Sequence, residues 1–222
     1  MCIRDRDSTL ITKNFILGKF DYQTHKLFIE IQPIHSSKPI FLNKEVYDAF
    51  VKMYTQAKAD GISLKIISGT RNFDEQKIIW ERKWKKYKHL QPIARAKKIL
   101  EYSSMPSSSR HHWGTDIDLN SLRNSYFEKG QGKKEYEWLV KNANSYGFYQ
   151  VYNTKDSGRT GYNLERWHWS YLPLAKVYLN FYNTHINYSD IHNFKGAKLG
   201  KALYIISDYV NGISEIAKLK IH

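Results

Sequence analysis

The sequence predicts an α+β fold, with helices packed around a small sheet. Apolar side chains recur at helical spacing over residues 46–57, Asn43 is a good N-cap before them, and Asp60 and Gly61 end the pattern. Short apolar or alternating segments, typical of strands, occur at 27–31, 64–67, 115–119, 148–152 and 167–171. The chain is 41% hydrophobic and 15% aromatic, a composition that can form a core.

The remaining elements follow from similar patterns. We expect helices over 92–102 and 135–146, the second ended by Gly147, and a further helix that opens at Pro173. The polar segment 120–134 is predicted to be a surface loop beside the cleft. In the tail, apolar residues at helical spacing predict one more helix, formed around Leu199, Leu203, Ile206 and Val210.

The ends of the chain suggest how it divides. Residues 1–6, MCIRDR, resemble a translated sequencing adapter, so we expect that they are an artefact and that the natural N-terminus is missing. The lone cysteine, Cys2, falls within them and carries no information about the redox compartment. We expect a catalytic domain over 7–182 and a helical extension over 183–222 that packs on it.

Charge narrows the classes of partner. The formal net charge is +14, which favours anionic partners such as nucleic acid, acidic lipid or anionic wall polymers. No apolar run approaches the roughly 20 residues of a membrane span. The sequence does not indicate an oligomeric state.

Residues 74–98 form the most basic stretch, with nine Lys or Arg against three Asp or Glu. Trp80, Trp84 and Tyr87 interleave with these cations, as they can in nucleic-acid-binding proteins. An amphipathic helix explains the pattern as well, with Ile78, Ile79 and the aromatic residues inward and the lysines in solvent. We favour the helix and expect no specific nucleic acid partner.

Two segments carry the candidate chemistry, 109–118 and 165–168. Together they offer two imidazoles and a carboxylate that could hold zinc, and a further carboxylate that could act as a base. Gly114 would let the chain bend and return His111 toward Asp118. Glu165 and His168 are three residues apart, so a turn between them is needed to aim both at one metal ion.

These segments resemble the zinc D-alanyl-D-alanine carboxypeptidases of the VanY type. The resemblance lies in Ser-x-His-x6-Asp at 109–118, Glu-x-Trp-His at 165–168 and a block at 67–76 similar to Ser-Gly-Tyr-Arg with a later Gln. The three blocks occur in the family's order. The family shares its fold with D,D-dipeptidases, lysostaphin-like peptidases and hedgehog domains, so the resemblance implies a central antiparallel sheet that carries the metal ligands.

The resemblance implies a role for each matching residue. His111, Asp118 and His168 would bind one Zn2+ per chain, and Glu165 would be the general base that activates the zinc-bound water. His112, next to the first ligand, is interpreted either as a bystander or as a neighbour that supports the ligands.

Three residues would contact substrate. The resemblance implies that Arg71, Gln76 and Ser109 bind the terminal residues of a peptide. The chemistry of the guanidinium allows Arg71 either to bind a substrate carboxylate with two hydrogen bonds or to stabilise the charge that develops in catalysis. The alternatives are structural: an ion pair of Arg71 with Asp74 or Asp116, a helix-surface position for Gln76 and an N-cap for Ser109.

Two positions depart from the family's pattern. Asp116 stands where the family usually has a small residue, and Thr70 stands where it has an aromatic one. Asp116 is predicted to share a strand face with Asp118, which would place an extra carboxylate near the metal.

The expected function is zinc-dependent removal of a C-terminal D-alanine from peptidoglycan stem peptides, in the periplasm or at the cell surface. The sequence does not separate a carboxypeptidase from a dipeptidase or an endopeptidase, nor D,D from L,D specificity. Two alternatives stay open: a non-catalytic zinc domain that binds wall or protein ligands, and a nucleic-acid binder that uses residues 74–98.

Overall fold

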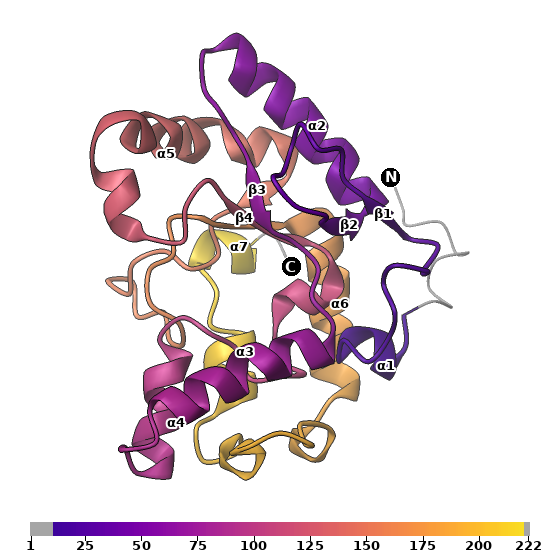
Figure 1. Ribbon diagram of the computed structural model, residues 1–222, viewed down its shortest axis with the longest axis vertical. Helices are drawn as coiled ribbons and strands as arrows, with labels where there is room; N and C mark the ends of the chain where they lie inside the picture. The colour runs from indigo at the N-terminus through magenta and orange to yellow at the C-terminus, as the bar shows by residue number, and fades with distance from the viewer. Residues whose placement is uncertain (1–10, 220–222) are drawn as a thin grey trace.

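The computed structural model describes residues 11–219, so the interpretation of residues 1–6 lies outside it. Figure 1 shows helices around a small central sheet, which confirms the α+β prediction. The strands are β1 (Phe28–Glu30), β2 (Phe41–Asn43), β3 (Ile66–Ser68), β4 (Asp116–Leu119), β5 (Phe148–Tyr149) and β6 (His168–Tyr171). The α-helices are α1 (Lys13–Ile16), α2 (Lys44–Ala59), α3 (Phe73–Lys86), α4 (Pro92–Leu100), α5 (Gly130–Asn142), α6 (Leu172–His185) and α7 (Glu215–Leu219).

The central sheet has the order β3-β4-β6-β5, and each neighbouring pair is antiparallel. Asp118 on β4 lies opposite His168 on β6 and also opposite Ser68 on β3. All four residues of β4 are buried. The middle of the sheet therefore brings the three sequence blocks together, with β1 and β2 forming a separate antiparallel pair.

Local capping explains where two of the helices begin. The side chain of Asn43 accepts a hydrogen bond from the Glu45 amide at the start of α2, as expected of an N-cap. Asn72 and Glu75 form a reciprocal capping box at the start of α3. This box fixes the point where α3 leaves β3, and so it fixes the position of Arg71 between them.

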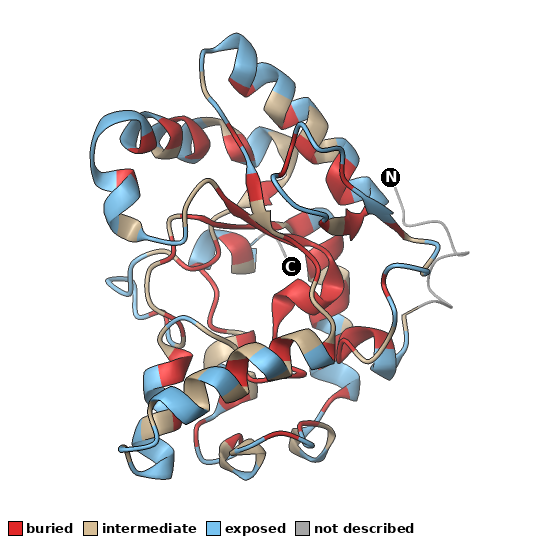
Figure 2. Ribbon diagram, viewed as in Figure 1, coloured by how far each residue is buried: buried red, intermediate tan, exposed pale blue. Residues whose placement is uncertain are grey.

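The core lies between the sheet and its surrounding helices. In Figure 2, buried residues concentrate at the centre of the molecule, on β4 and on the inner faces of the helices, while α2 and α5 expose their outer faces. Trp80, Trp113 and Trp169 are among the largest fully buried side chains. Within residues 11–219, no helix combines the length and the apolar character needed to cross a lipid bilayer.

Several expected elements differ in detail. Ile78 on α3 is 67% exposed, so its predicted inward position is wrong; the buried face is formed by Phe73, Gln76 and Trp80. The helix predicted to start at residue 135 begins at Gly130, inside the segment expected to be a loop, although Gly147 does end the helical stretch. The expected strand 148–152 is shortened to Phe148–Tyr149.

The tail does not form the single helix predicted around residues 199–210. It contains a short 3-10 turn (Ala197–Leu199), a six-residue π-helix (Ile205–Val210) and then α7. Ile205, Val210 and Ala217 nevertheless belong to the same buried cluster as the strands. The proposed domain boundary at 182 falls inside α6, which continues to His185.

Candidate metal centre

The first two ligand candidates are joined by a tight corner. His111 lies in a short 3-10 helix (Arg110–Trp113), and Gly114 follows it with φ 67°, a left-handed conformation that glycine adopts without strain. The chain then enters β4, which carries Asp118. The corner turns His111 back onto the strand, so that its Nε2 lies 3.4 Å from Asp118 Oδ2, as the sequence predicted.

A second turn positions Glu165. Residues 166–167 form a turn immediately before β6, and the His168 amide donates a hydrogen bond to the Glu165 carbonyl. The turn brings Glu165 Oε2 to 3.7 Å from His168 Nδ1. On a regular strand, the side chains of Glu165 and His168 would point in opposite directions. The turn instead directs both toward the same point in the site.

The three ligand candidates fit a metal ion. One atom from each of His111, Asp118 and His168 lies within 4.8 Å of the others, and all three residues are buried. Asp118 Oδ1 is 3.0 Å from His168 Nδ1, and Asp118 Oδ2 is 3.4 Å from His111 Nε2. Ligand atoms on tetrahedral zinc are roughly 3.3 Å apart, given zinc–nitrogen and zinc–oxygen bonds of about 2.0–2.1 Å. The donor set and its spacing therefore suit zinc.

Burial shapes the charges at this centre. Desolvation raises the pKa of Glu165 to about 8, an effect that the nearby cations His168 and Arg71 only partly oppose. Burial alone would raise the pKa of Asp118, but His111 and His168 outweigh it and hold that pKa well below its usual range. The two carboxyl groups therefore differ in protonation: Glu165 can accept and release a proton, whereas Asp118 stays ionised.

Asp116 lies on the same face of β4 as Asp118 and approaches His168 from the other side. Its Oδ2 is 2.9 Å from His168 Nε2 and 3.0 Å from Arg110 Nε. Its Oδ1 accepts hydrogen bonds of 2.7 Å from the hydroxyls of Thr115 and Ser170. The extra carboxylate foreseen from the sequence is present, but an arginine accompanies it.

Arg71 and Gln76 are linked at the start of α3. Arg71 Nε donates to Gln76 Oε1 over 3.1 Å, and Arg71 Nη1 donates to Ser68 Oγ over 2.5 Å. The ion pair that Arg71 makes is with Asp118, at 4.0 Å, and not with Asp74 or Asp116. Gln76 is buried rather than on a helix surface, and its Nε2 donates to the Ser104 carbonyl.

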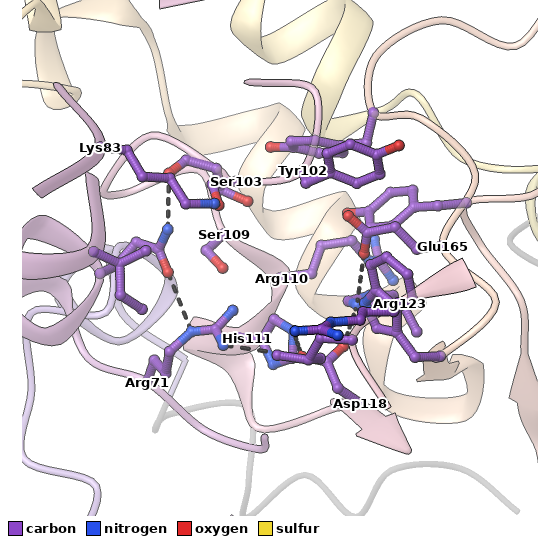
Figure 3. A pocket seen from close by; sticks show the side chains of 18 of the residues that line it. Arg71, Lys83, Tyr102, Ser103, Ser109, Arg110, His111, Asp118, Arg123 and Glu165 are labelled. Atoms are coloured by element: carbon purple, nitrogen blue, oxygen red, sulfur yellow. Dashed lines mark hydrogen bonds and ion pairs between the residues drawn. The ribbon is translucent and has the colours of Figure 1, made fainter. Parts of the chain in front are cut away.

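Ser109 and Lys83 lie beside this pair. The Ser109 hydroxyl is buried and has no hydrogen-bond partner within residues 11–219. Lys83 follows Gln76 by two helical turns and donates to Ser103 Oγ over 2.5 Å. Partial burial lowers the pKa of Lys83. Figure 3 shows Lys83, Ser103 and Ser109 on the side of Arg71, with Glu165 and Arg123 across from them.

These groups share one cleft of about 500 Å³. Its lining includes every residue predicted from the sequence to bind metal or substrate or to act as the base: Arg71, Gln76, Ser109, His111, Asp118, Glu165 and His168. Five cationic side chains line it: Arg71, Arg82, Lys83, Arg110 and Arg123. A cleft with this lining can receive a ligand that carries a carboxylate.

Some cleft residues were not identified from the sequence. The Tyr152 ring packs on the His168 ring with 4.6 Å between centroids, and Lys83, Ser103 and Arg123 line the walls. The position of Lys83, seven residues after Gln76 on one helix, was a usable signal. Tyr152 and Arg123 lie in irregular segments, where no sequence periodicity indicated that they would face the cleft.

Comparison with known proteins agrees with this geometry. Residues 39–174, more than half of the chain, match the family model described as VanY, D-alanyl-D-alanine carboxypeptidase. The protein YodJ of Bacillus subtilis (strain 168) is 31% identical over 141 residues, which are 62% of this chain and 49% of that protein. The chain spans roughly half of the length of the curated relatives it matches.

Two solved structures share the fold. A mutant of the vancomycin-resistance D,D-pentapeptidase VanY, in complex with Zn(II), has a TM-score of 0.55 and 21% identity over 74% of this chain and 88% of its own. The LD-carboxypeptidase LdcB has a TM-score of 0.56 and 21% identity over 86% of this chain and 81% of its own. Together with the family match, these likenesses show that the chain belongs to the VanY family of D-alanyl-D-alanine carboxypeptidases.

Proposed function

We propose that this protein is a zinc-dependent carboxypeptidase that removes a C-terminal D-alanine from peptidoglycan stem peptides, outside the cytoplasm. One observation carries the proposal: a buried His111–Asp118–His168 cluster lies next to Glu165 in a cleft that Arg71 also lines. A hydrolase needs the metal ligands and the base to converge in this way. A binding domain needs no base at this position.

Different residues of the chain would carry out the separate steps of hydrolysis. Bound zinc would lower the pKa of a coordinated water and polarise the scissile carbonyl. Glu165 would take a proton at its carboxylate from the attacking water and return it to the leaving amine. Its raised pKa of about 8 suits a group that must both accept and donate. Arg71, 4.0 Å from Asp118, would stabilise the oxyanion that develops on the carbonyl.

The other wall would bind the end of the peptide. The unpartnered Ser109 hydroxyl can form a hydrogen bond to a ligand, and the Arg71–Gln76 pair holds the guanidinium in place. The cations of the cleft would attract the free C-terminal carboxylate that a carboxypeptidase substrate carries. They would also favour approach to the anionic polymers of a cell wall.

The central test is hydrolysis by wild type and Glu165→Gln. We expect about one equivalent of zinc in both proteins, loss of one terminal alanine from a muropeptide pentapeptide with wild type, and at least a 10²-fold lower rate with the variant, because its amide cannot accept the proton. Metal analysis and mass spectrometry provide the readouts. Glu137→Gln, an exposed change on α5, is the matched control.

The other outcomes separate the alternatives. Zinc binding without cleavage of any wall peptide would favour the non-catalytic zinc domain. Absence of zinc would contradict the proposal and leave nucleic acid binding, tested by the salt dependence of affinity. Against that alternative, Trp80 is buried and Arg95 lies 4.5 Å from the Trp84 ring centre, so these rings are not free to stack on bases.

A further inference from the structure

Both histidines of the metal centre have one ring nitrogen directed at the cluster and the other at an acceptor. His111 Nδ1 is 2.8 Å from the Gly69 carbonyl, which accepts its proton and leaves Nε2 for a metal. His168 is reversed: Nδ1 faces Asp118 and Glu165, and Nε2 faces Asp116 Oδ2 at 2.9 Å. The two acceptors differ, because one is a neutral carbonyl and the other is a carboxylate.

Asp116 occupies this position with every oxygen engaged. It is fully buried, and hydroxyls of Thr115 and Ser170 hold Oδ1 while Arg110 and His168 share Oδ2. Since these partners come from β6, from the 3-10 helix before β4 and from the residue just before β4, the carboxylate cannot rotate away without breaking several hydrogen bonds. A buried anion held so firmly fixes the orientation of the imidazole that contacts it.

Arg110 neutralises the added charge. Its guanidinium is 1% exposed, donates to Asp116 over 3.0 Å and to Ser170 over 2.7 Å, and lies 4.8 Å from the Trp113 ring centre. An isolated buried carboxylate would be very costly, but this pairing offsets the cost. The positive charge of Arg110 therefore offsets the negative charge of Asp116 within this chain.

We propose that Asp116, with Arg110 as its counter-ion, is a positioning residue that holds the Nε2 proton of His168 and thereby directs Nδ1 to the metal. The inference rests on the proposed zinc site. A carboxylate acceptor makes the imidazole a stronger ligand than a carbonyl acceptor does, so Asp116 tightens metal binding as well as orienting the ring. Asp116 itself does not bind the metal or the substrate.

The test measures zinc affinity and the His168 ring directly. Zinc is titrated into metal-free protein against a chelator of known affinity, and NMR of 15N-labelled histidines follows the ring protons, with His168→Ala for assignment. Asp116→Asn keeps an acceptor but loses its charge. The double variant Asp116→Ala with Arg110→Met removes both charges and avoids an unpaired buried arginine. Asp156→Asn, in an exposed loop, is the control.

We expect zinc affinity to fall about 10-fold to 100-fold in the double variant, less in Asp116→Asn and not at all in Asp156→Asn. The His168 Nε2 proton should exchange slowly with water in wild type and fast in the double variant, while melting curves confirm that both are folded. A double variant that binds zinc within threefold of wild type would overturn the inference. Equally fast exchange of the His168 Nε2 proton in metal-free wild type and metal-free double variant would also overturn it. This exchange measurement does not require zinc, so it can be read even if wild type binds no zinc and the proposed function fails.

Discussion

His112 is a buried side chain that joins separate parts of the site without taking part in the chemistry. Its Nδ1 donates to the Arg71 carbonyl over 2.7 Å, and its Nε2 accepts from the Ser107 amide over 3.1 Å. This pairing requires the neutral ring, because a proton on Nε2 would oppose the Ser107 amide proton. Of the two roles that the sequence left open for His112, this geometry favours the supporting neighbour over the bystander.

The neutral state of His112 predicts a loss of stability in acid. Burial lowers its pKa to about 3, whereas in the unfolded chain the pKa is about 6.5. The unfolded state therefore binds the extra proton first, and the stability that depends on neutral His112 is lost as pH falls from about 6.5 toward 3. The slope from this one group approaches about 1.4 kcal/mol per pH unit.

The measurement compares denaturant unfolding of wild type and His112→Gln from pH 7 to pH 4, with chelator present so that zinc does not contribute. We expect wild type to lose its advantage over the variant as pH falls, because the glutamine does not titrate. His89→Gln, an exposed histidine, is the control. Parallel pH curves for wild type and His112→Gln would contradict the prediction.

At the scale of elements, the corner between the 3-10 helix and β4 depends on Gly114. Its φ is 67°, and an added Cβ would lie 2.4 Å from Phe28 Cε1. The Gly114 carbonyl also accepts a hydrogen bond from the Asn43 amide, the cap of α2. One residue thus sets the direction of His111 and ties the corner to a neighbouring helix.

We expect Gly114→Ala to lower the free energy of unfolding by about 2–4 kcal/mol, since it adds a steric clash to the cost of a left-handed alanine. Gly158→Ala is a matched control, because Gly158 has φ 82° but open space around its Cβ position. It should cost only about 1–2 kcal/mol. Chemical denaturation measures both, and an equal loss in the two variants would show that the clash with Phe28 is relieved without cost.

Some features of the helices and of the site could be predicted from the sequence, and others could not. The start and end of α2 were predictable, because Asn43, Asp60 and the apolar spacing between them are local signals. The face of α3 was assigned partly wrongly, because Ile78 lies away from the stripe formed by Gln76 and Trp80 and only the position of the neighbouring chain decides which side is covered. The residues of the three motifs could be found from their order, but Asp116's pairing with Arg110 required the fold.

At the scale of the whole molecule, the tail closes over a helix formed much earlier in the chain. Trp80 Nε1 donates to the Lys195 carbonyl over 2.8 Å, and the Trp80 ring meets the Phe194 ring edge-on at 6.0 Å. The Trp80 side chain is fully buried there. Since α3 also carries Gln76, the tail supports the helix that forms one wall of the cleft.

This packing predicts that tail and sheet unfold together. Trp80→Phe should lower the free energy of unfolding by about 2 kcal/mol, through lost volume and an unsatisfied Lys195 carbonyl, while unfolding remains a single transition. Trp84→Phe, a change at a partly buried neighbour, should cost less. Calorimetry with limited proteolysis provides the readout, and a separate early transition that releases residues after 185 would contradict it.

The contact between Trp80 and Lys195 also bears on how the chain is made. A ribosome releases α3 long before residues 194–196, so a nascent chain must carry Trp80 uncovered while more than a hundred further residues are synthesised. The helix that forms one wall of the cleft therefore gains its contact with residues 194–195 only late in synthesis. Until then, this face of Trp80 is an apolar surface that a chaperone can bind.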